Sequence, residues 1–310
     1  MSGVIRCGAA VVVLTLTAAT HIVAQDATSP FVVGVWGQGD AIIPFADFDG
    51  RRWRSSWPAP VETEPDPRPL QRIPAAWWGR STFQPAWELV EANGRRRNIQ
   101  ITGTASAALG SGCSSNLGLT TDAGARTYQY GTVLASSRAG AIEPVETLTS
   151  TAAEWRRVTA LLPGIYQQHE ASAWKDTSED FRPDMTTPLS RPTLDAAFTS
   201  ADELGQYLYF ESSREFARRR EQLGSERSFI TGWLWRRSSE LPFHVVIVQA
   251  ATNDEDGKGV ASFRPLGVVR HGAQRFWLGS LTSYAYSGLT VLDVRRAGVR
   301  QILVVDYAGC

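Results

Sequence analysis

The chain of 310 residues is poor in the side chains and motifs on which many catalytic sites depend. It has four histidines, three cysteines and two lysines, and it lacks Gly-x-Ser-x-Gly, His-Glu-x-x-His, Cys-x-x-Cys and phosphate-binding glycine motifs. These absences exclude the sequence signatures of nucleophile-elbow hydrolases, zinc proteases, dithiol oxidoreductases and P-loop proteins, and no cofactor signature is present. The formal net charge of zero also argues against a nucleic acid or an anionic membrane as a partner held by overall charge.

The first 25 residues predict an export signal. A positive charge precedes the apolar run at 9–16, and small residues then lead to a cleavage position after Ala24 or Gln25. We therefore expect a secreted or periplasmic protein. Residues 7–24 come close to the roughly 20 residues that span a bilayer, so an uncleaved N-terminal anchor is the alternative. No other segment of the sequence is long and apolar enough to cross a membrane.

Removal of this signal leaves two cysteines, Cys113 and Cys310. Exported proteins mature where disulfides persist, so an even number of thiols predicts one bridge between them. The bridge would tie the last residue of the chain to the first β region, and closing so long a loop contributes about 5 kcal/mol as an upper estimate. Two free thiols are the alternative. Cys7 precedes the apolar run of the signal and so does not have the position of a lipoprotein cysteine.

The composition is that of an ordinary globular protein, with 43% hydrophobic and 20% charged residues. Residues 26–310 are long enough for one large β-rich domain, which we expect. The alternative is two halves, 30–149 and 193–310, joined by a helix and linker at 150–192. That linker contains a polar, proline-containing stretch at 175–193.

Short runs of β-branched and aromatic residues alternate with tight turns over most of the chain. The clearest runs lie at 31–36, 51–54, 98–104, 206–211, 243–248, 290–294 and 301–305. Asp49-Gly50 and Asn93-Gly94 each separate such runs, and both dipeptides favour hairpin turns in which the backbone needs a positive φ. This alternation predicts antiparallel β-sheets.

One segment breaks the β pattern. Between residues 150 and 174, apolar residues such as Trp155, Val158 and Leu162 recur at helical spacing, although Pro163 is expected to end or interrupt the helix. The fold class predicted is therefore mainly β, with antiparallel strands and hairpins and one helical insert near 150–174. The sequence leaves a propeller-like and a sandwich arrangement open.

Carboxylates and tryptophans gather around the first hairpin. The group consists of Asp40, Asp47, Asp49, Trp36, Trp53 and Trp57. Two carboxylates beside aromatic rings are typical of glycosidase clefts, where one acts as an acid and the other as a base or nucleophile. An aromatic hairpin with polar turns has the same composition, so the sequence alone does not separate the two interpretations.

The acidic loop Asn253–Gly257 is the strongest candidate for a metal site, because closely spaced oxygens and a glycine suit Ca²⁺. The EF-hand pattern is not met, since Phe263 stands where a bidentate glutamate belongs. We therefore expect a structural turn and no metal. The arginines at 218–220 are interpreted in the same way, as a solvated connection with local ion pairs and not as an anion site.

The three remaining histidines, His169, His244 and His271, form no recognisable ligand or catalytic spacing. The prediction for function is thus an exported, non-catalytic binding or structural module, with a glycan or a protein at the cell surface as its ligand. The alternative is a secreted hydrolase, directed at carbohydrate, that uses the carboxylates of the first hairpin.

Overall fold

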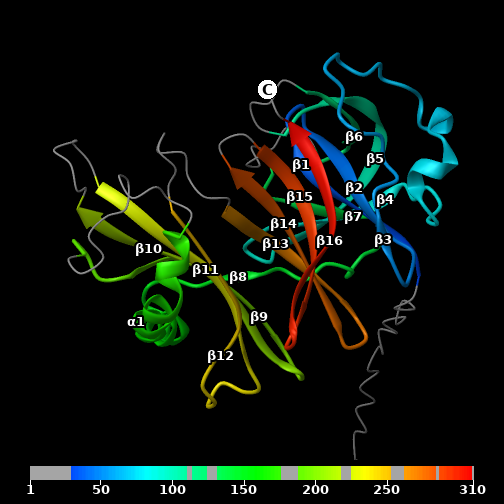
Figure 1. Ribbon diagram of the computed structural model, residues 1–310. Helices are drawn as coiled ribbons and strands as arrows, with labels where there is room; N and C mark the ends of the chain where they lie inside the picture. Colours follow the sequence, from blue (N-terminus) through cyan, green and yellow to red (C-terminus); the bar gives the residue numbers. More distant parts are fainter. Residues whose placement is uncertain are drawn as a thin grey trace, which may run out of the picture.

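The computed structural model describes residues 29–109, 114–123, 131–175, 188–217, 225–252, 262–283 and 286–308 (Figure 1). The fold is mainly β, and every strand pairing among these residues is antiparallel, as the sequence predicts. The predicted signal at 1–25, Cys113, Cys310, Arg218–Arg220 and the loop Asn253–Gly257 lie outside the described residues, so the expectations about them stay predictions. The described part of the chain contains no helix with both the length and the apolar character that a membrane span requires.

The N-terminal strands close into a six-stranded barrel. These strands are β1 (Phe31–Gly37), β2 (Ala41–Phe48), β4 (Ala86–Val90), β5 (Arg96–Ala107), β6 (Asn116–Thr121) and β7 (Leu134–Ser136). Their order is β1-β7-β4-β5-β6-β2, and pairing of β1 with β2 closes the ring. The short strand β3 (Trp53–Arg54) pairs with the end of β2. Two short 3-10 helices, η1 (Leu70–Arg72) and η2 (Ala75–Trp78), precede β4. Four tryptophans fill the interior: Trp36, Trp57, Trp78 and Trp87.

Both predicted glycine turns form where the sequence places them. Gly50, with φ 89°, lies in the turn from β2 to β3, and Gly94, with φ 83°, lies in the turn from β4 to β5. Residues with a side chain rarely adopt such positive φ values, which explains the glycines.

Two smaller sheets follow, and in each of them neighbouring strands are consecutive along the chain. The five-stranded sheet has the order β12 (His244–Thr252), β11 (Ser225–Arg236), β10 (Gly205–Ala217), β9 (Thr193–Asp202) and β8 (Glu146–Thr147), and a helix is inserted between β8 and β9. The four-stranded sheet consists of β13 (Ser262–His271), β14 (Gln274–Ser283), β15 (Tyr286–Arg295) and β16 (Gly298–Ala308). The segment 143–147 joins the two along one side, because Glu143 exchanges backbone hydrogen bonds of 2.7 and 2.8 Å with Val268 of β13 and β8 pairs with β9.

Among the described residues, α1 (Ala153–Ala173) is the only α-helix. It confirms the predicted helical insert near 150–174. Val158, Leu162 and Ile165 pack on one face of the five-stranded sheet. Pro163 lies inside this continuous helix, so the prediction that it ends or interrupts the helix is wrong.

The elements stack in the order barrel, four-stranded sheet, five-stranded sheet and helix (Figure 1). One apolar cluster joins the outer face of β1 and β2 to the four-stranded sheet, and another joins that sheet to the five-stranded one. The two smaller sheets therefore pack face to face as in a sandwich, beside a closed barrel. Whether the chain forms one domain or two halves stays a prediction.

Candidate functional site

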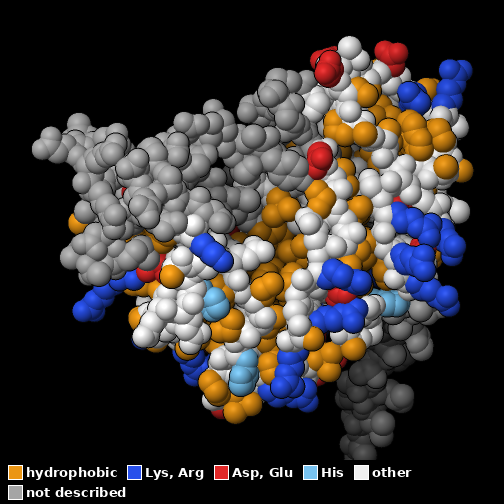
Figure 2. All heavy atoms as spheres, in the orientation of Figure 1, with side chains coloured by type: hydrophobic (Ala, Val, Ile, Leu, Met, Phe, Trp, Pro, Cys, Tyr) orange, Lys and Arg blue, Asp and Glu red, His pale blue; other side chains and the backbone are white. Residues whose placement is uncertain are grey.

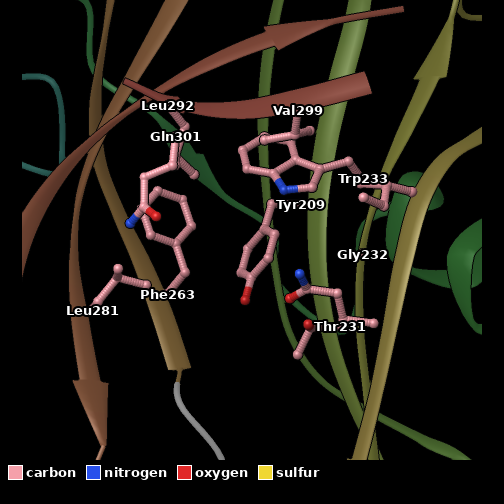
Figure 3. A pocket seen from close by; sticks show the side chains of 11 residues that line it. Tyr209, Thr231, Gly232, Trp233, Phe263, Leu281, Leu292, Val299 and Gln301 are labelled. Carbon is pink, nitrogen blue, oxygen red and sulfur yellow. The ribbon is translucent and has the colours of Figure 1, made fainter. Parts of the chain in front are cut away.

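A cleft of about 310 Å³ lies between the two smaller sheets (Figure 3). Strands β10, β11 and β12 provide Tyr209, Thr231, Gly232, Trp233, Ile247 and Gln249, and the opposite sheet provides Phe263, Leu281, Leu292, Val299 and Gln301. Edge strands β12 and β16 approach each other here, but no ladder of backbone hydrogen bonds joins them in the part of the chain described. In Figure 2, apolar side chains gather in the recess between the two sheets.

Three aromatic rings form the floor of this cleft. The ring centroid of Tyr209 lies 5.1 Å from that of Trp233 and 5.3 Å from that of Phe263, and the last two rings are 6.0 Å apart. Each residue is at most 5% exposed. The rings pack against one another in tilted and edge-on arrangements, so they offer an apolar floor and not the broad exposed platforms on which sugars stack.

The walls are aliphatic, and the polar groups that line the cleft are uncharged. Leu281, Leu292 and Val299 form one side, while Thr231 and Gln249 add a hydroxyl and an amide on the other. An apolar cleft with a few polar groups is the usual composition of a small-molecule site, and its volume lies at the lower end of the usual range.

A hydrogen-bonded carboxylate borders the cleft. The hydroxyl of Tyr209 donates to Glu211 Oε1 at 2.8 Å, and the hydroxyl of Ser262 donates to the same oxygen, also at 2.8 Å. Burial, and then the nearby charge of Glu211, raise the pKa of Tyr209, while Thr231 and the backbone of Phe263 partly offset the rise. Tyr209 therefore stays protonated, and its hydroxyl remains the donor in the hydrogen bond to Glu211.

The alternation of side chains along β10 creates this arrangement. Tyr207, Tyr209 and Glu211 point to the face that meets the four-stranded sheet, whereas Leu208 and Phe210 point to the face that packs against α1. The sequence predicts this strand but gives no sign of the cleft, because both of its faces are apolar and nothing local tells which sheet covers each one.

The carboxylates of the first hairpin occupy contrasting environments. Asp47 is 2% exposed and packs against Gly79, where an added Cβ would lie 2.1 Å from Asp47 Oδ2. Burial raises the pKa of Asp47, and Ser56 and Arg54 only partly offset the rise. Ser56 acts from nearby, although no hydrogen bond of ordinary geometry reaches either carboxylate oxygen.

Asp49 shapes the turn that follows β2. It accepts the backbone N–H groups of Arg51 and Arg52 at 2.9 and 2.8 Å and pairs with Arg54 at 3.0 Å. The bond from the Arg52 backbone has the largest effect and lowers the pKa of Asp49. Burial opposes it, but the bond from Arg51 and the charge of Arg54 also lower this pKa. Asp40 lies in the β1–β2 turn with φ 54°. The nearby Trp36, Trp53 and Trp57 are all buried in apolar clusters.

The three described histidines lie on three different elements. His169 is on α1, His244 begins β12 with its ring 6.1 Å from that of Trp235, and the ring of His271 lies 5.1 Å from that of Phe48. Within the described ranges, no three His, Cys, Asp or Glu side chains gather in a way that could hold a metal ion.

No protein-family model matches the chain, and no curated protein or solved structure matches it either.

Proposed function

We propose that this protein is an exported, non-catalytic binding module that holds a small, largely apolar ligand between its five- and four-stranded sheets. The observation that carries the proposal is the cleft itself, with its floor of Tyr209, Trp233 and Phe263. Removing apolar surface from water supplies the free energy of binding, and the amides of Gln249 and Gln301 orient the ligand. A cleft of this size and composition favours a small molecule over the glycan or protein ligand suggested by the sequence.

A filling substitution tests this function. In Val299→Trp the indole occupies the cleft, so the neutral dye N-phenylnaphthylamine should bind at least about tenfold more weakly than to the unmodified protein. The matched control is Val61→Trp, because Val61 is 44% exposed and belongs to the segment that pairs with Ser115 beside the barrel. Dye binding that is equal in both variants, or that is absent from the unmodified protein, would contradict the proposal.

The contrast between Asp47 and Asp49 favours a second candidate, a secreted hydrolase. Carboxylates whose pKa values are shifted in opposite directions can divide the roles of acid and base. Hydrolysis of a glycan panel should then be lost in both Asp47→Asn and Asp49→Asn but retained in Asp40→Asn, since Asn tolerates the positive φ at that turn. Turnover that survives in both of the first two variants would remove this site.

Export and the disulfide belong to the same proposal. We expect the mature chain to begin after Ala24 or Gln25 and to contain a Cys113–Cys310 bridge. N-terminal sequencing of protein recovered from the periplasm or medium tests the first point. Peptide mapping without reductant tests the second, and alkylation of both cysteines would exclude the bridge.

A further inference from the structure

Glu211 lies beside the cleft, because it accepts a hydrogen bond from the cleft residue Tyr209, although it is not one of the residues that line the cleft. It follows Tyr209 by two residues on β10, so both side chains lie on the sheet face that meets the four-stranded sheet, and its direct neighbour across the ladder to β11 is the cleft residue Thr231. Ser262, which also contacts Glu211, immediately precedes the cleft residue Phe263 in the sequence. Oε1 of Glu211 is occupied by the hydroxyls of Tyr209 and Ser262, whereas no described group donates to Oε2.

Glu211 differs from most other weakly exposed carboxylates that the structure describes, because those form ion pairs with arginines. The pairs are Glu88–Arg96, Glu154–Arg236, Glu170–Arg214, Asp202–Arg275 and Asp293–Arg295. Glu211 is half-buried and receives hydrogen bonds only from neutral hydroxyls, and no described Arg, Lys or His forms a salt bridge with it. A half-buried carboxylate is costly to keep charged without a cation, and among the described residues no cation lies against Glu211.

We infer that Glu211 is the counter-ion for a ligand cation, and that the ligand is a small amphiphile with an ammonium group on an apolar body. The inference rests on the proposed function, since the apolar body occupies the cleft. The ammonium group donates a charge-assisted hydrogen bond to Oε2 of Glu211. The ring of Tyr209 adds an attraction for the same cation, because aromatic faces carry negative potential.

The probes octylammonium, octanol and octanoate share nearly the same apolar chain but differ in charge, so they separate the effect of charge from that of apolar contact. The affinity of each is measured by its displacement of N-phenylnaphthylamine from the purified full chain at neutral pH and low ionic strength. Octylammonium should bind about tenfold more tightly than octanol, which corresponds to about 1.4 kcal/mol, and octanoate should bind most weakly. In Glu211→Gln the preference for octylammonium should disappear while octanol binds as before, because the glutamine oxygen still accepts from Tyr209 and Ser262.

Glu215→Gln is the matched control. Glu215 lies on the same strand but pairs with Arg227, so its substitution should leave the order of the three probes unchanged. Equal binding of all three probes, or a preference that persists in Glu211→Gln, would overturn the inference and leave the cleft as a binding site. Failure of every probe and of the dye to bind would overturn the proposed function and the inference together.

Discussion

The ion pair between Asp202 and Arg275 is predicted to hold the two smaller sheets together at one end. Arg275 Nε donates to Asp202 Oδ2 at 2.8 Å, and the two side chains are 3% and 4% exposed. Asp202 is the last residue of β9 and Arg275 is the second residue of β14, so the pair joins the two sheets. The charge of Arg275 is poorly solvated, and this burial lowers the pKa of Arg275 to about 10. Removing either partner should therefore be costly.

The two single substitutions should differ in size. In Asp202→Asn the guanidinium loses its charged partner and keeps a neutral amide oxygen, the Gly205 carbonyl at 3.2 Å and the face of Tyr207, with Glu143 acting at longer range, so we expect a loss of about 3–5 kcal/mol. In Arg275→Met the carboxylate keeps Arg270 at 3.4 Å and the N–H of Leu204 at 2.7 Å, so the loss should be about 2–3 kcal/mol.

Urea unfolding of both variants and of the double variant measures these losses and their coupling. The double variant leaves no unpaired charge of this pair buried. Its loss of stability should therefore be about 1–3 kcal/mol smaller than the sum of the two single losses. Arg295→Met is the control, since Arg295 is half-exposed and pairs with Asp293 within one strand, so it should cost at most about 1 kcal/mol. Additive losses, or single losses as small as that of the control, would refute the role of this pair.

Two further predictions concern pH. Burial raises the pKa of Asp47, so the contribution of this carboxyl to stability is present below the ordinary pKa of 3.8 and is lost as the pH rises. Asp47→Asn should therefore raise the urea midpoint at neutral pH. A gain in midpoint that persists in acid would contradict this prediction. Burial also raises the pKa of Tyr166 and Tyr209, so stability should fall as pH rises above 10, and tyrosinate absorbance should show both groups ionising only with unfolding.

Local sequence signals predict the elements of this fold better than their partners. The turns at Gly50 and Gly94 and the helix α1 follow from backbone preference and apolar spacing, which act within a few residues. Closure of the barrel depends on β7, whose three residues pair with both β1 and β4. So short a strand carries little periodicity of its own. Pro163 is a further case in which local preference fails. Proline disfavours a helix interior, but packing of α1 on its sheet maintains the helix through this residue.

The candidate site was harder to predict than the fold, for a related reason. The cleft combines side chains from β10 to β16, and which of them meet depends on how two sheets stack. Glu211 carries no local signal, because a glutamate at the end of an apolar run normally marks the solvent-exposed end of a strand. The signal that singles it out is the absence of an arginine partner, and only the three-dimensional arrangement of the described residues reveals it.

The arginine pairs explain why the cleft forms where it does. Asp202–Arg275 joins the two sheets, and Glu154–Arg236 and Glu170–Arg214 join α1 to the five-stranded sheet. Buried pairs of this kind add little net stability, because desolvation offsets their attraction, but a misplaced partner is strongly penalised. They therefore favour one stacking of the layers over others. Backbone bonds at 143–147 and the Asp202–Arg275 pair hold one side of the two sheets together, so the cleft opens on the opposite side, between β12 and β16, where we propose that the ligand binds.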